Sequence, residues 1–169
     1  MKKLFKLTFL LLIVVLISGC TEKTASGTTV NSESDMTDSK GVLYCTREAT
    51  GMNNAAVECS YDVYYNKGNV TKVHSIEKVT SSSEEVLETY RSAYENVFKV
   101  YKDLDHYYNT VTDEGNTIIS ETTIEYDKVD LDKLKELENT NDSVIKNGKV
   151  ALKDWLKFAE NFGTKCTEK

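Results

Sequence analysis

The sequence predicts an α+β domain built on an antiparallel β-sheet of about five strands, with helices packed on one face. Two observations support this prediction. Segments that alternate apolar and polar residues are separated by turns rich in glycine and asparagine, and apolar residues at helical spacing follow the third and the fifth of these segments. Three strands, a helix, two strands and then helices form an order typical of α+β domains.

The first twenty residues predict a secretory signal of the bacterial lipoprotein type. Three lysines precede an apolar run at residues 7–17, which is shorter than the roughly 18 residues that a membrane-spanning helix needs. The run ends in the sequence Ser-Gly-Cys, which resembles a lipobox with its cysteine at Cys20. The resemblance implies that the signal peptide, residues 1–19, is removed. It also implies that acyl chains on Cys20 anchor the protein to the extracytoplasmic face of the cell membrane.

The mature chain divides into a tether and one domain. Residues 20–40 contain the lipidated cysteine and a segment rich in Ser, Thr and charge, which predicts a flexible tether, and residues 41–169 form a single domain. Loss of the three lysines of the signal peptide leaves 18 basic and 27 acidic residues, a net charge of −9. An acidic chain lacks the basic footprint of a nucleic-acid binder, and we expect its body not to adhere to an anionic membrane surface.

The domain begins with three predicted strands. Residues 42–49 and 55–66 flank a loop that contains glycine and two asparagines. In the second strand every other residue from Val57 to Tyr65 is apolar or aromatic, so we expect that face to be buried. A third strand follows at residues 70–80, but its weaker alternation does not identify its buried face.

A long helix follows the third strand and extends to about Lys102. Ser82 and Glu85 fit a capping box, in which the hydroxyl and the carboxylate bond to the first free amides of the helix. This role also accounts for the three consecutive serines at 81–83 better than a nucleophile does. The apolar positions recur every three or four residues and are Val86, Tyr90, Ala93, Tyr94, Val97, Phe98 and Tyr101.

Two strands and two short helices complete the prediction. Residues 105–112 and 117–126 form a hairpin around a turn at 113–116. Asp130 caps a short helix, and a last helix covers residues 152–162. An Asn147-Gly148 turn lies between these helices, and Gly163 suits the left-handed conformation that follows a helix end.

Several motifs resemble those of a known family. They are the lipobox with its tether, Cys45-Thr46-Arg47, and the segments KVHSIEKV (72–79), IEYDKVD (124–130) and IKNGKV (145–150). The chain resembles the YehR-like small bacterial lipoproteins over most of residues 1–166. The resemblance implies a membrane-anchored α+β domain, and it provides no catalytic residues.

Three cysteines remain after lipidation of Cys20, and two pairings compete. Cys45 and Cys59 are symmetric about Met52, so a hairpin centred there would place them opposite each other. Members of the resembled family often carry one cysteine in the first strand and one at the end of the chain, which matches Cys45 and Cys166. We favour this pairing, because its longer loop restricts the unfolded chain more. Three free thiols remain the other alternative.

The remaining candidate residues form no catalytic signature. His106 lies near Asp103 and Asp105 and could bind a metal or act as a base, but one local group of this kind is more typical of a surface histidine. Most of the ten tyrosines are expected in the core or at its rim. Tyr64 and Tyr108 are as compatible with exposure, where they could stack on a sugar or a peptide.

The sequence therefore favours a lipid-anchored, extracytoplasmic protein that binds or organises a component of the cell envelope without catalysis. An envelope enzyme, or a binder of a metal or small ligand that uses the acids around His106, is the alternative, and a structural spacer is a third. No cofactor, metal ligand or catalytic residue is expected. The expected partners are the membrane, through Cys20, and an envelope protein or wall component.

Overall fold

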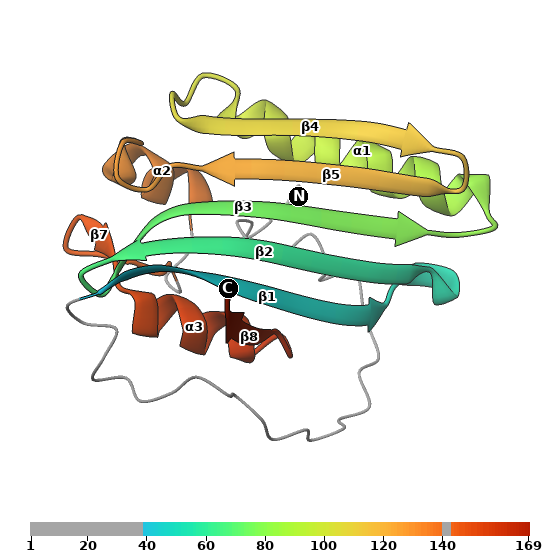
Figure 1. The fold of residues 1–169 in the computed structure, drawn as a ribbon. Coiled ribbons are helices and arrows are strands. Elements are labelled where there is room, and N and C mark those ends of the chain that lie inside the picture. Colours follow the sequence, from blue (N-terminus) through green and yellow to red (C-terminus); the bar gives the residue numbers. More distant parts are fainter. Residues whose placement is uncertain (1–38, 140–142) are drawn as a thin grey trace, which may run out of the picture.

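The computed structural model describes residues 39–139 and 143–169 as a six-stranded antiparallel sheet with three α-helices (Figure 1). The expected signal peptide, Cys20 and nearly all of the expected tether lie outside the described residues. The elements are β1 (Lys40–Thr50), the short 3-10 helix η1 (Met52–Asn54), β2 (Ala56–Asn66), β3 (Asn69–Thr80), α1 (Glu84–Tyr101), β4 (Tyr107–Glu114), β5 (Thr117–Ile124), α2 (Leu131–Glu138), β6 (Ile145–Lys146), β7 (Lys149–Val150), α3 (Leu152–Glu160) and β8 (Lys165–Glu168).

The predicted fold class is confirmed. The strands are arranged in the order β4-β5-β3-β2-β1-β8, and β6 and β7 form a separate two-stranded hairpin. Among the helices of the described residues, none is long and apolar enough to cross a membrane.

Strand β2 is the centre of the predicted alternation. Its side chains at every second position from Val57 to Tyr65 are buried, as expected for an antiparallel strand with one covered face. Strand β3 pairs with β2 along its whole length, with a register shift between Tyr64 and Tyr65. The shift accounts for the weak alternation of β3, because one extra residue interrupts the period of two.

Helix α1 begins one residue later than the capping box predicts. Ser83, not Ser82, is the N-cap, and its Oγ accepts a hydrogen bond from the Val86 amide at 3.5 Å. The Ser81 hydroxyl accepts a bond from the Ser83 amide at 3.1 Å. Three adjacent serines offer the same side chain, so residue type alone does not identify which of them caps the helix.

The elements that follow α1 lie close to their predicted positions. Strand β4 begins two residues later than expected and extends to Glu114, because the hairpin turn contains only Gly115 and Asn116. Asp130 caps α2 and accepts a bond from the Lys133 amide at 3.0 Å. Gly163 has a positive φ of 77° after α3, as predicted.

Strand β8 was not predicted and makes the sheet six-stranded instead of five-stranded. Its four residues pair with β1, and Cys166 lies opposite Cys45. Four residues that include one cysteine contain too few positions for an apolar period to be recognised.

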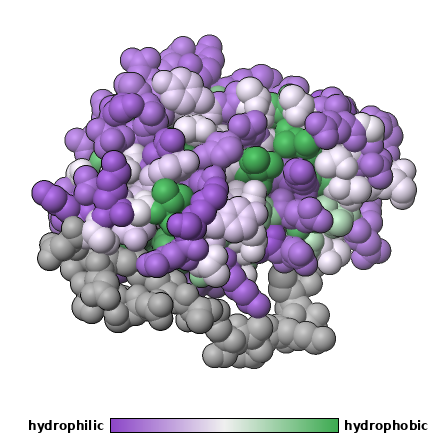
Figure 2. Space-filling model, viewed as in Figure 1, coloured by the Kyte–Doolittle hydropathy of each residue, from purple (hydrophilic) through white to green (hydrophobic). Residues whose placement is uncertain are grey.

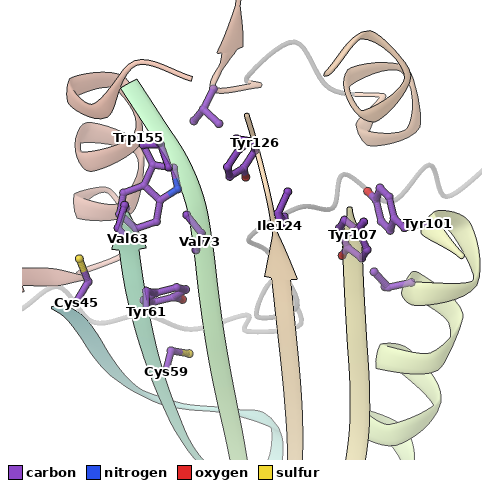
Figure 3. Close-up of a cluster of buried hydrophobic side chains, with 14 of the residues drawn as sticks. Cys45, Cys59, Tyr61, Val63, Val73, Tyr101, Tyr107, Ile124, Tyr126 and Trp155 are labelled. Atoms are coloured by element: carbon purple, nitrogen blue, oxygen red, sulfur yellow. The ribbon is translucent and has the colours of Figure 1, made fainter. Parts of the chain in front are cut away.

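Helices α1 and α3 cover the same face of the sheet. Tyr94 of α1 donates a hydrogen bond to Glu77, and Trp155 of α3 packs edge-on against Tyr61, with ring centroids 6.1 Å apart. Glu77 pairs with Cys59, which is two residues from Tyr61, so both contacts lie on one face. Figure 3 shows Trp155 and Tyr61 in this core, and Figure 1 shows α1 behind β4 and β5. Among the described residues no helix covers the opposite face, which we call the open face.

Candidate functional site

The open face of the sheet carries a continuous cross-strand row of polar and aromatic residues. The register places Tyr44, Asp62, His74, Thr123 and Tyr108 side by side on β1, β2, β3, β5 and β4. Tyr44 is 43% and Tyr108 is 55% exposed, so an exposed ring stands at each end of these five residues, and Thr167 of β8 lies beyond Tyr44. Four strand spacings separate the two rings, a distance of roughly 19 Å along the sheet.

Ion pairs and ring contacts hold the other side chains of this face in place. The His74 Nε2 lies 2.8 Å from Glu121 Oε1, and Lys169 Nζ donates to both carboxylate oxygens of Asp62 at 2.9 and 3.0 Å. Lys72 Nζ lies 3.9 Å from the centroid of the Tyr64 ring, a cation–π distance. These contacts connect side chains of neighbouring strands across the open face.

The face is mixed in character and not a broad apolar patch. Figure 2, seen from the side opposite α1, shows isolated hydrophobic residues among hydrophilic ones. A shallow hollow of about 230 Å³ lies over β1, β2 and β3, lined by Tyr44, Thr46, Arg47, Glu48, Glu58, Cys59, Ser60, Ile76 and Lys78. Such a surface fits a polar ligand with some flat apolar area better than a hydrophobic helix.

The favoured disulfide is confirmed. Cys45 and Cys166 are bonded, and Cys59 is free and buried. The competing pairing fails because the β1–β2 loop is centred one residue later than expected, with Thr50 opposite Ala56. This shift places Cys59 opposite Arg47 and Cys45 opposite Tyr61, so the two cysteines are diagonal neighbours.

A buried polar row crosses the helix-covered face. Arg47 Nη2 donates to Cys59 Sγ at 3.2 Å, the thiol lies 3.5 Å from Glu77 Oε2, and the Tyr94 hydroxyl donates to Glu77 Oε1 at 2.5 Å. Burial, and then the Glu77 carboxylate, raise the pKa of Cys59 to about 11, so the thiol stays protonated at neutral pH. Burial also raises the pKa of Glu77. The protonated thiol is a poor nucleophile. The row is therefore better suited to holding the strands together than to nucleophilic catalysis.

Sequence reasoning missed Arg47 and Glu77. The signal was present for Arg47, because it is two residues from Cys45 and thus on the same strand face. No such signal existed for Glu77, since the buried face of β3 follows from its register with β2.

His106 pairs with a different acid from the ones expected. Its Nδ1 lies 2.9 Å from Glu125 Oε2, just after β5, and within the described residues neither Asp103 nor Asp105 bonds to the ring. Lys128 Nζ donates to the other Glu125 oxygen at 2.9 Å, and the bonds from Lys128 and His106 lower the pKa of Glu125. Residues 39–139 and 143–169 contain no group of three His, Cys, Asp or Glu side chains that could hold a metal.

A second hollow, of about 500 Å³, lies at the end of the sheet where β1 begins. Gly41 lets β1 pass close to a core ring here, because a Cβ at this position would lie 2.5 Å from the Tyr65 hydroxyl oxygen. We call this hollow the end groove. Its lining residues are Lys40, Gly41, Val42, Tyr64, Tyr65, Thr71, Lys72, Glu125, Asp127 and Lys128.

These features define a disulfide-closed α+β domain with one helix-covered and one open sheet face. The chain is similar to the NMR structure of the YehR protein of E. coli, at 18% identity and a TM-score of 0.55, over 79% of this chain and 94% of that one. An NMR structure of a protein from Streptococcus pneumoniae TIGR4 is 14% identical, with a TM-score of 0.47, over 90% and 97% of the two chains. No family model and no curated protein matches the chain. The first likeness shows a YehR-like fold.

Proposed function

We propose that the protein is a lipid-anchored, extracytoplasmic domain that binds a component of the cell envelope without catalysis. The observation that carries the binding role is the open sheet face, where Tyr44 and Tyr108 are exposed at the two ends of this five-residue row. Aromatic rings with polar tips are suited to ligands that combine flat apolar surfaces with hydrogen-bonding groups, such as wall sugars and peptides.

The location is supported by two features. The disulfide between Cys45 and Cys166 fits an oxidising compartment outside the cytoplasm. The lipobox-like sequence before Cys20 and the YehR-like fold support membership of the YehR-like small lipoproteins.

Anchoring is tested by fatty-acid labelling of cells that express the full chain. Cys20→Ser removes the only site for acyl attachment in the lipobox, so we expect the protein to move from a detergent-extractable, acylated form to an unprocessed precursor without lipid. Incorporation of labelled fatty acid is the readout. Label that persists in the Cys20→Ser variant contradicts the anchor.

Binding is tested by thermal unfolding of the full chain against wall fragments, sugars and peptides. A ligand that binds only the native state stabilises it by about 2.7 kcal/mol at a hundredfold excess over its Kd. We expect the shift to be lost in Tyr44→Ala or Tyr108→Ala and kept in Thr112→Ala, an exposed residue of β4 away from the row. A shift that survives both tyrosine substitutions places the binding site elsewhere.

The alternative, an enzyme or a metal binder at His106, rests on the single pair with Glu125. Metal salts in the same panel test this alternative directly.

A further inference from the structure

Strand β4 is an edge of the sheet, with β5 on one side and no strand of the described chain on the other (Figure 1). It pairs with β5 without a register shift over all eight of its residues. Natural sheet edges are commonly protected by charged side chains, proline, a bulge or a very short strand. Strand β4 has no proline and no bulge, and its only charged residues, Asp113 and Glu114, lie at its end. The other edge strand, β8, has four residues, begins with Lys165 and is followed by Lys169.

The backbone of β4 alternates between groups that face β5 and groups that face away from the sheet. Where the strand starts, the Glu125 amide bonds to His106 O at 3.0 Å, whereas the Tyr107 amide bonds to Leu104 O at 3.3 Å. His106 therefore faces the β5 side and Tyr107 faces away, and this pattern repeats every second residue of an antiparallel pair. The outward-facing residues of the strand that follow are Asn109, Val111 and Asp113. Within the described chain, no hydrogen bond reaches the amide or carbonyl groups of these three residues.

A second copy of β4 matches these outward groups in one antiparallel register. When Val111 lies opposite Val111 of the second copy, Asn109 lies opposite Asp113, so all three outward residues of each copy exchange hydrogen bonds. A displacement by two residues in one direction would pair Asp113 with Tyr107, whose amide is already bonded within its own chain. The same displacement in the other direction would pair Asn109 with Gly115, which lies in the turn after the strand. The register centred on Val111 therefore satisfies the most backbone groups.

The side chains of β4 are compatible with the same register. On the open face, Thr110 lies opposite Thr112 of the second copy, and symmetry repeats this pair. Cross-strand threonine pairs stabilise a sheet, whereas like charges that lie directly opposite each other destabilise it. Glu114 lies opposite Tyr108, and Asp113 lies opposite an asparagine, so no acid faces an acid across the two strands. The strand is thus self-complementary in its side chains as well as in its backbone.

We propose that the protein forms a dimer through antiparallel pairing of β4 with β4 of a second copy, centred on Val111. The two six-stranded sheets then form one continuous sheet. Residues that lie opposite each other in a strand pair share a face, so the open faces of both copies lie on the same side. Each copy contributes mainly one strand, which makes the interface small, and we expect a concentration-dependent equilibrium between monomer and dimer. This contact does not depend on the ligand proposed for the open face.

The first test is sedimentation equilibrium of the full chain in density-matched detergent, over a range of protein concentrations. We expect the mass to rise from that of one copy to that of two, and a mass of one copy at every concentration overturns the proposal. Thr110→Lys with Thr112→Lys places lysine opposite lysine at both threonine pairs, so we expect this variant to dimerise roughly tenfold more weakly. Both threonines are exposed, so the variant should fold, and thermal unfolding checks this.

A charge reversal at the same two positions tests the register. Thr110→Lys with Thr112→Glu places each lysine opposite a glutamate, so we expect this variant to dimerise at least as strongly as the wild type. An equal loss of dimer in both variants overturns the pairing of residue 110 with residue 112. A dimer that persists unchanged in the double-lysine variant forms through another surface or through the apolar run at residues 7–17, and also overturns the proposal.

Amide hydrogen exchange of the wild-type chain gives a second test that needs no substitution. The amides of Asn109, Val111 and Asp113 should exchange more slowly as the protein concentration rises, because they become bonded in the dimer. The amides of Thr110 and Thr112 face β5 and should show no such change, so they are the internal control. Exchange at the three outward amides that stays constant while the mass doubles would overturn the proposal.

Discussion

At the scale of single residues, the buried row from Arg47 to Glu77 is the least expected feature. A charged residue between sheet and helix carries a large desolvation cost unless it is paired and hydrogen-bonded. Here Cys59 lies between Arg47 and Glu77, and Tyr94 bonds to the far side of the carboxylate. Cys59 is thus better described as a link in this row than as a surplus cysteine.

The raised pKa of Glu77 predicts a pH dependence of stability. A carboxyl group whose pKa is higher in the folded state contributes stability that is present below the unfolded pKa, near 4.5, and is lost as the pH rises through the folded pKa. Glu77→Gln keeps an acceptor for Tyr94 but does not titrate. We expect the variant to lose less stability than the wild type between pH 4 and pH 8 in urea unfolding. Parallel curves for the two proteins would contradict the assignment.

At the scale of elements, the alternation of apolar and polar residues predicted β2 and its buried face, because a period of two can be recognised in the sequence of the strand itself. Helix α1 was predicted from apolar spacing, but its cap was not, since three serines carry the same local signal. Strand β8 was not predicted, because its strand conformation depends on pairing with β1 and not on an alternation of apolar and polar residues in its own sequence.

The position of the cap gives a prediction with a built-in control. Ser83→Ala removes the acceptor of the Val86 amide and should lower the free energy of unfolding by about 1 kcal/mol. Ser82→Ala, one residue away, removes no cap and should change it by less than about 0.5 kcal/mol. Chemical denaturation of both variants measures the difference. A larger loss of stability in Ser82→Ala than in Ser83→Ala would instead identify Ser82 as the N-cap, as the capping box predicts.

At the scale of the whole molecule, the disulfide joins residues 121 positions apart and so closes nearly the entire domain into one loop. The open face and the pairing of charges across strands are also properties of this scale. They depend on strand register and order, which no local window of sequence contains. The sequence therefore predicted which side chains are apolar but not which charges meet.

Loss of the disulfide should lower the stability of the whole domain. Cys45→Ser with Cys166→Ser is expected to lower the free energy of unfolding by about 2–5 kcal/mol, because the unfolded chain gains freedom. Hydrogen exchange should show the largest loss of protection in β8, which pairs only with β1. A matched Cys59→Ser variant keeps the disulfide. Unchanged stability of the double variant would mean that pairing alone holds β8.

The contact between β8 and β1 also determines where the domain can be labelled. The Lys169 amide donates to Val42 O at 3.0 Å, so the carboxyl terminus leaves the molecule beside the start of β1. A fluorescent protein or affinity tag fused after Lys169 would lie beside the start of β1, where the segment that carries the proposed lipid anchor joins the domain. The Gly115-Asn116 turn, at the far end of the sheet, is the insertion point that leaves this junction free.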